Sequence, residues 1–181
     1  MFAIEAIFDQ ETEEQIYAYW RSLQESGLDD SMIRIPGNRP HISLGLFHGV
    51  ERTMFLDAFR AFSKGVEPVA VQFDSLAVFP TTSTVFLSPL PSKAFHKVHE
   101  SLYKHLSDFA SKGDDHYKKE QWMPHCSVAI SVSEEALLPV MENAIQRFQP
   151  IKGTIERIAL IEVFFDDKGI HHVEEVSLDE D

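Results

Sequence analysis

The sequence predicts an α+β fold in which a mixed or antiparallel sheet is covered by outer helices. Segments with helical periodicity alternate with strand-like segments, and turn signals join several of the strands as hairpins. Hairpins produce antiparallel neighbours, whereas a doubly wound parallel sheet needs a long crossover between successive strands. One octet of residues also occurs once in each half of the chain, so we expect a single two-lobed domain over residues 1–181 with pseudo-twofold symmetry.

Helix and strand signals follow one another through the first half of the chain. Asp9 is a suitable N-cap, because its side chain can accept a hydrogen bond from the first helical turn. Glu11 and Glu13 favour the positive end of the helix dipole, and Gly27 ends the helix. The expected elements are a strand at 2–8, a helix from 9 to about 26, a short edge strand at 32–36, a strand at 41–47 and a helix at 51–62.

The second half shows a similar order of elements. Residues 80–82 separate two strand-like runs as a hairpin, and residues 166–169 separate the last two strands in the same way. Ser133 is a suitable N-cap for the helix after the second octet. The expected elements are strands at 67–79 and 83–88, a helix from 91 to about 111, a polar loop at 113–121, a strand carrying the second octet, a helix from 133 to about 148, and strands at 153–165 and 169–176.

The repeated octet is the strongest functional signal in the chain. Its copies, RPHISLGL and MPHCSVAI, both read Pro-His-x-Ser followed by small or apolar residues, and their histidines are 84 positions apart. Successive strand residues point to opposite faces, so His41 and Ser43 share one face, and His125 and Ser127 share a face of the other strand. Two such strands set side by side would bring two imidazoles and two hydroxyls to one cleft.

These four side chains suit the cleavage of a phosphodiester. The reaction needs a base to activate the nucleophile and an acid to protonate the leaving oxygen, and an imidazole with a pKa near 6.5 can serve as either. His41 and His125 are therefore the candidate catalytic residues. Each serine lies about 6.6 Å along its strand from the histidine of the same motif, so the hydroxyls of Ser43 and Ser127 can donate to the non-bridging phosphate oxygens. The near-symmetric pair leaves open which histidine is the base.

The tetrapeptides HISL and HCSV, about half a chain apart, resemble the paired motifs of the two-histidine phosphoesterase superfamily. That superfamily includes the bacterial RNA 2′,3′-cyclic phosphodiesterases, also called 2′-5′ RNA ligases. The resemblance implies a two-lobed fold with the motifs on central strands lining a cleft, and catalysis without a metal or other cofactor. It also implies a cyclic phosphate of a nucleotide or RNA end, or a 2′-5′ linkage, as substrate. Hydrolysis versus ligation, and the natural substrate and pathway, stay open.

Two other functions remain compatible with the sequence. The same fold could serve as a non-catalytic module that binds a nucleotide or an RNA end, which an activity assay would distinguish from an enzyme. A structural or interaction domain with incidental histidines is the third alternative. In that case substitution of His41 or His125 would change only stability.

The net charge of −13 argues against binding to a long tract of nucleic acid, because proteins that track a phosphate backbone carry a basic stripe. We therefore expect a small nucleotide or an RNA end as partner. No apolar run approaches the roughly 20 residues that cross a membrane, and the acidic N-terminus and single cysteine suit a cytoplasmic protein. The oligomeric state is open. The acidic residues from about 174 to 181 are expected to form a solvated, frayed tail.

Weaker candidates flank the two motifs. Basic residues near the motif entrances are candidate contacts for a phosphate or ribose: Arg39, Lys118 and Lys119. Candidates for the border of a base pocket are Phe47, His48 and Trp122. Cys126 should point away from the cleft, since it alternates with His125 and Ser127. The histidines of the long helix complete no recognisable metal-ligand set and are expected to be structural or surface residues: His96, His99 and His105.

Overall fold

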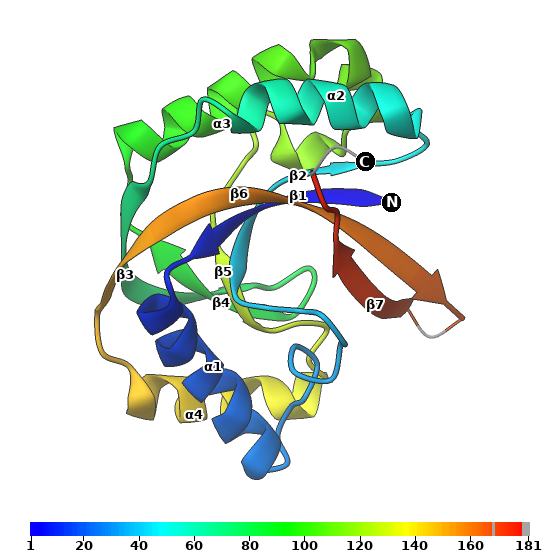
Figure 1. The fold of residues 1–181 in the computed structure, drawn as a ribbon. Helices are drawn as coiled ribbons and strands as arrows, with labels where there is room; N and C mark the ends of the chain where they lie inside the picture. Colours follow the sequence, from blue (N-terminus) through cyan, green and yellow to red (C-terminus); the bar gives the residue numbers. More distant parts are fainter. Residues whose placement is uncertain (168, 179–181) are drawn as a thin grey trace.

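Strands and helices alternate along the chain, and the computed structural model describes residues 1–167 and 169–178 (Figure 1). The elements are β1 (Phe2–Phe8), α1 (Gln10–Glu25), β2 (His41–Phe47), α2 (Arg52–Ser63), β3 (Val69–Phe79), β4 (Thr84–Pro89), α3 (Lys93–His105), the 3₁₀ helices η1 (Ser107–Lys112) and η2 (Asp115–Tyr117), β5 (Cys126–Ala129), α4 (Glu134–Arg147), β6 (Ile151–Asp166) and β7 (Gly169–Glu175).

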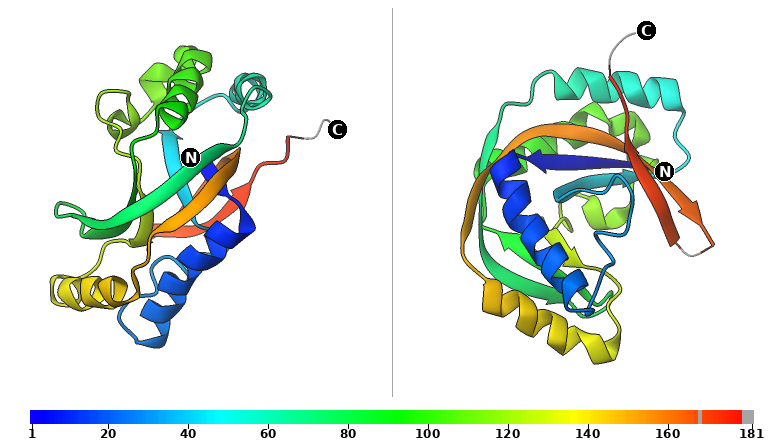
Figure 2. Two further views of the ribbon diagram at one scale, coloured as in Figure 1. Left: turned by 90° about the vertical axis from the view of Figure 1, so that its left-hand side faces the viewer. Right: turned by 60° about the horizontal axis from the view of Figure 1, so that its bottom comes forward.

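The strands of the described residues form one antiparallel sheet. Their order is β2-β1-β6-β3-β4-β5, and β7 pairs with β6. The long strand β6 pairs with β3 near its start and with β1 and β7 further along, so it joins the two parts of the sheet. The sheet curves (Figures 1 and 2), and its two end strands, β2 and β5, contact each other. The predicted α+β class with antiparallel pairing and outer helices is confirmed.

Two helix pairs cover the sheet at opposite ends of the molecule. α2 packs with α3, and α1 packs with α4, so each pair takes one helix from each half of the chain (Figure 1). Gly153 in β6 lets α1 lie close, because a Cβ there would come within 1.7 Å of the Thr12 hydroxyl oxygen. The core under the helices is rich in fully buried aromatic side chains such as Phe8, Trp20 and Phe55. No helix in the described part of the chain is long and apolar enough to cross a membrane.

The edge strand predicted at 32–36 is wrong, because this segment forms successive turns. Arg34 donates its backbone N–H to the carbonyl of Asp30 at 3.0 Å, and Gly37 adopts a φ of 81°, which favours glycine. Such local bonds satisfy the backbone without a neighbouring strand. The segment still contacts the sheet, since the carbonyl of Pro36 accepts a hydrogen bond from Val173 of β7 at 3.0 Å.

The segment between α3 and the second motif is also more structured than predicted. α3 ends at His105 rather than near residue 111, because Leu106 leaves helical geometry with ψ of 21°, and the chain continues as η1. A bridge between Phe47 and Gly113 ties the end of η1 to β2. η2, which lies in the predicted polar loop, contacts β2 as well. The loop is thereby held beside the first motif.

The acidic C-terminal segment begins inside the last hairpin. Glu175 ends β7 and forms an ion pair with Arg157, and Val176 donates its N–H to the carbonyl of Leu160 at 2.8 Å. The first part of the predicted tail is therefore anchored to the sheet. Lys168 of the predicted turn and residues 179–181 of the predicted tail lie outside the described residues.

Candidate active site

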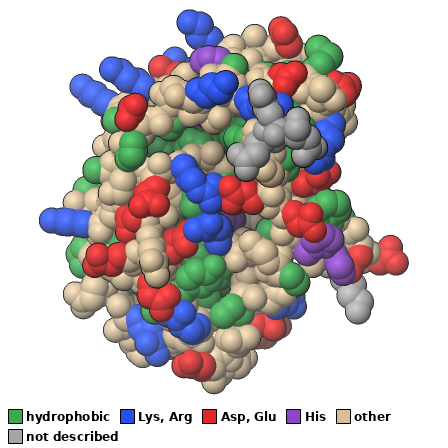
Figure 3. Space-filling model, viewed as in Figure 1, with side chains coloured by type: hydrophobic (Ala, Val, Ile, Leu, Met, Phe, Trp, Pro, Cys, Tyr) green, Lys and Arg blue, Asp and Glu red, His purple; other side chains and the backbone are tan. Residues whose placement is uncertain are grey.

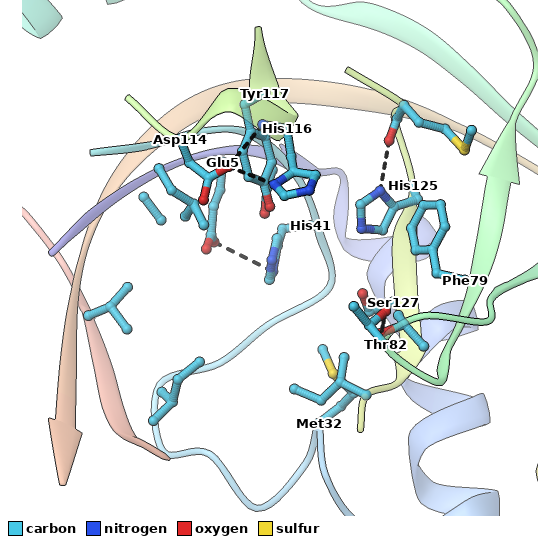
Figure 4. A pocket seen from close by; sticks show the side chains of 18 of the residues that line it. Glu5, Met32, His41, Phe79, Thr82, Asp114, His116, Tyr117, His125 and Ser127 are labelled. Carbon is cyan, nitrogen blue, oxygen red and sulfur yellow. Dashed lines mark hydrogen bonds and ion pairs between the residues drawn. The ribbon is translucent and has the colours of Figure 1, made fainter. Parts of the chain in front are cut away.

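The two motif histidines and the two motif serines line one cavity of about 550 Å³ (Figure 4). His41 and Ser43 lie on β2, while His125 immediately precedes β5, which carries Ser127. Contrary to what the resemblance implied, the motifs do not lie on central strands, because β2 and β5 are the end strands of the sheet; its curvature brings them into contact. The structure thus brings together all four residues that the repeated octet singled out.

Both histidines are oriented by the same kind of hydrogen bond. Nδ1 of His41 lies 2.7 Å from the carbonyl oxygen of Arg39, and Nδ1 of His125 lies 2.7 Å from that of Met123. A carbonyl oxygen can only accept, so each Nδ1 donates a proton and each neutral imidazole has its lone pair on Nε2. Nε2 is therefore the atom at which either histidine can take up or release a proton.

His125 lies among aromatic rings. The ring centroids of Phe79 and Phe86 are 4.9 and 5.2 Å from that of His125. Burial lowers the pKa of His125, and the nearby His41 lowers it further, while the hydrogen bond to Met123 raises it. The balance favours the neutral imidazole, which is the form that can accept a proton.

His41 has a carboxylate beside it instead. Oε2 of Glu5 lies 3.5 Å from Nδ1 of His41, and the Glu5 side chain is buried on β1. Burial raises the pKa of Glu5, and the interaction with His41 is the largest effect that lowers it. Glu5 is not among the site residues predicted from the sequence. The signal that could have found it is one acidic residue in the otherwise apolar run of β1.

Two tryptophans fix the backbone of the motif serines. Trp122 donates its indole N–H to the carbonyl of Ser43 at 2.9 Å, and Trp20 donates to the carbonyl of Ser127 at 3.1 Å. β2 and β5 each pair with one strand in the described part of the chain, so an indole supplies a donor where a further strand is lacking. Trp20 is buried, and no pattern in the sequence indicated this hydrogen bond.

A buried histidine supports the loop beside β2. The ring of His99 stacks on Trp122 with centroids 3.9 Å apart, and its Nε2 lies 2.9 Å from the carbonyl oxygen of Tyr117. Tyr117 lines the cavity, and its side chain forms a hydrogen bond with Ser43. Burial raises the pKa of the Tyr117 phenol, and the hydrogen bond with Ser43 lowers it by a smaller amount. His99 therefore orients two residues that contact the first motif.

The stability of the fold should depend on pH through His99. Burial lowers the pKa of His99 from 6.5 to about 4. The unfolded chain takes up this proton below about pH 6.5, and the folded chain only near pH 4, so stability falls as the pH is lowered through this window. We expect the melting temperature to fall from about pH 7 to pH 4.5, and to fall less in His99→Gln. The melting temperatures are measured by circular dichroism, and an equal fall in the wild type and in His99→Gln would contradict this assignment.

Most of the weaker sequence candidates lie outside the cavity lining. The three basic candidates each pair with an acid that is not in the lining: Arg39 with Glu13 at 2.6 Å, Lys118 with Asp115 at 2.5 Å, and Lys119 with Glu100 at 2.9 Å. Phe47 is buried in the core, and His48 does not line the cavity. Trp122 does line it.

The remaining candidates have structural surroundings. Cys126 is fully buried, and burial raises the pKa of its thiol to about 12, which keeps it a neutral packed side chain. His96 and His105 each place Nδ1 within hydrogen-bond distance of a main-chain carbonyl of their own helix or its N-cap. Among the described residues, no group of three or more His, Cys, Asp or Glu side chains is arranged to hold a metal ion.

The other walls of the cavity differ in character. One is apolar and comes from the N-terminal residue and from β1, β2, β6 and β7: Met1, Ala3, Leu46, Val163, Ile170 and Val173. The β3–β4 hairpin contributes the hydroxyls of Thr82 and Thr84, 3.0 Å apart, and Figure 4 shows Thr82 beside Ser127. Asp114 and His116 form an ion pair at 2.9 Å in the same lining. The volume suits a small molecule.

Comparison with known protein families supports the same assignment as the motifs. The family model described as the 2′-5′ RNA ligase superfamily matches residues 12–163, a range that includes both octets. The chain belongs to this superfamily. A search among curated proteins finds no match.

Several solved structures share the fold of this superfamily member. A structure titled phosphoesterase matches with a TM-score of 0.69 at 12% identity, and apo LigT of E. coli matches with 0.66 at 12%. Protein TT0787 of Thermus thermophilus matches with 0.65 at 13%. Each match covers 97% of this chain and 94% of the other. At such low identity the likeness demonstrates the fold alone.

Proposed function

We propose that this superfamily member is a phosphodiesterase that opens a cyclic phosphate, such as a 2′,3′-cyclic nucleotide or RNA end, or cleaves a 2′-5′ linkage. The observation that carries the proposal is the pair of equivalent imidazoles, both bonded through Nδ1 to a carbonyl two residues earlier, at one cavity with two serines. Equivalent histidines on either side of a phosphate supply a base and an acid without need of a metal.

The surroundings of the two rings suggest how the roles divide. His125, whose pKa is lowered by burial, takes a proton from water on Nε2 as the water oxygen forms a bond to phosphorus. The phosphorus–oxygen bond of the ring breaks, and the leaving ribose oxygen receives the proton of Nε2 of His41. Ser43 and Ser127 donate hydrogen bonds to the non-bridging oxygens, where negative charge develops. The histidines then exchange protons with solvent to restore the starting state.

A small nucleotide, or the end of an RNA, is the proposed partner. Solved structures of E. coli LigT include complexes with 3′-AMP and with ATP, which supports a nucleotide ligand in this fold. On the face drawn in Figure 3, Lys and Arg side chains are interspersed with Asp and Glu rather than gathered in a stripe. That distribution suits recognition at a single phosphate. A buried lone cysteine is consistent with the proposed cytoplasmic location.

The proposed activity is tested by incubating the purified protein with a panel of 2′,3′-cyclic nucleotides and 2′-5′ dinucleotides in EDTA. We expect turnover of at least one substrate, unchanged by the chelator, because both proposed proton-transfer groups are side chains. Activity that disappears in EDTA and returns with a divalent cation would identify a metal-dependent hydrolase. Tight binding of a nucleotide without turnover of any panel member would favour a non-catalytic binding module on the same fold.

A further inference from the structure

Glu5 is a buried carboxylate in a strand that is otherwise apolar. All seven residues of β1 are buried, and the side chain of Glu5 lines the cavity, whereas its apolar sequence neighbours Ile4 and Ala6 do not. The pairing of β1 with β2 shifts register between Ile4 and Glu5, and Glu5 lies opposite Ser43. Irregularities of this kind can re-aim a side chain beside an active site. Burying a carboxylate opposes folding, so its position calls for a compensating role.

The contact between Glu5 and His41 distinguishes the two motif histidines, which are otherwise held alike. Oε2 of Glu5 lies 3.5 Å from Nδ1 of His41, and Figure 4 shows the carboxylate and the ring facing each other. At the corresponding place, His125 contacts the rings of Phe79 and Phe86. A negative charge at this distance from a largely buried ring favours the imidazolium form, whereas aromatic surroundings favour the neutral ring.

We propose that Glu5 is a positioning residue whose charge makes His41 rather than His125 the acid of the pair. The proposal rests on the proposed phosphodiesterase function and explains how two near-identical motifs take different roles. Glu5 acts through His41 and needs no contact with the substrate. The Nδ1 proton of His41 remains bonded to the carbonyl of Arg39, so the carboxylate acts by its charge on the whole ring.

Other titratable groups surround the pair, and their side chains all remain present when position 5 is substituted. Arg39 and Glu175 act on the pKa of Glu5, His41 lowers the pKa of His125, and three more groups come from the loop beside β2: Asp114, His116 and Tyr117. Cys126 stays neutral, because burial raises the pKa of its thiol to about 12. The charge of Glu5 is thus the variable that an isosteric amide changes.

The test compares Glu5→Gln with Glu13→Gln across pH 5–9. Glu13 is a matched control because it is also a poorly exposed glutamate near the first motif, but it pairs with Arg39 and does not line the cavity. Loss of the Glu5 charge should move the alkaline limb of the kcat profile to lower pH by about one unit, which lowers kcat on that limb roughly tenfold. KM should change little, and Glu13→Gln should keep the wild-type limb.

Two further readouts separate this role from a structural one. Burial raises the pKa of Glu5, so its carboxyl opposes folding increasingly as the pH rises, and Glu5→Gln should melt no lower than wild type at pH 8. The NMR titration of the His41 ring should move to lower pH in Glu5→Gln and stay in place in Glu13→Gln. If the His41 titration does not move in Glu5→Gln, the proposal is overturned, whether or not the wild-type protein turns over a substrate. Absence of turnover in the wild-type protein would be a separate failure of the proposed function. An unmoved limb in an active enzyme would overturn it as well.

Discussion

Replacing His41 or His125 with alanine is expected to lower the turnover of a 2′,3′-cyclic nucleotide by on the order of 10²–10⁴-fold in each case, the usual effect of losing a positioned proton-transfer group. The two Nε2 atoms serve one phosphate in sequence, so the double variant should lose much less than the product of the single losses. Measurement of kcat and KM for the single and double variants checks both statements.

Controls for these variants come from the same two motifs. Ser43→Ala and Ser127→Ala remove a phosphate donor but no proton-transfer group, so they should lower turnover less and weaken anion binding. All four variants should keep the wild-type melting profile near neutral pH, since the substituted side chains border the cavity. The wild-type pH profile should be bell-shaped, with limbs that belong to the histidine pair jointly. Full activity in either histidine variant would reject the mechanism.

Trp20→Phe and Trp122→Phe should each lower the free energy of unfolding by about 1–3 kcal/mol, because each leaves a serine carbonyl without its indole donor. The loss should also reach catalysis, since these bonds fix the two strands that carry the motifs. We expect a several-fold lower turnover in each variant, measured beside stability from urea unfolding.

Tyr103→Phe provides the matched comparison for the tryptophan variants. Its hydroxyl is buried and has no hydrogen-bond partner among the described residues, so removing it deletes a buried polar group without breaking a bond. Tyr103→Phe should therefore be neutral or slightly stabilising. Tryptophan variants that are no less stable than Tyr103→Phe would show that the indole bonds do not support the motif strands.

The motif residues could be predicted from the sequence because a doubled pattern is local and strand alternation is simple geometry. His41, Ser43, His125 and Ser127 could be assigned to one cavity from two octets, and hairpin signals were enough for antiparallel pairing. The same alternation correctly placed Cys126 in the interior.

The remaining features depend on contacts between residues far apart in the sequence. Glu5 reaches His41 through the pairing of β1 with β2, and Trp20 reaches Ser127 across 107 positions of the chain. Arg39 is adjacent to the motif in sequence, yet it pairs with Glu13 on α1. The segment at 32–36 has an apolar pattern typical of a strand, but its own turns satisfy its backbone. Tertiary packing decided the outcomes at Glu5, Trp20 and Arg39, whereas local turns decided the outcome at 32–36.

The most direct test of the central claim is an NMR titration of the histidine side chains with a nucleoside 2′-monophosphate, one of the two monophosphates that opening a 2′,3′-cyclic phosphate can give. If His41 and His125 flank one phosphate, both ring signals should shift together and fit one common dissociation constant, and binding should weaken in Ser127→Ala. His105, whose ring bonds a carbonyl of its own helix and which does not line the cavity, should stay unchanged as an internal control. A shift of only one motif histidine, or two separate dissociation constants, would contradict a shared phosphate site.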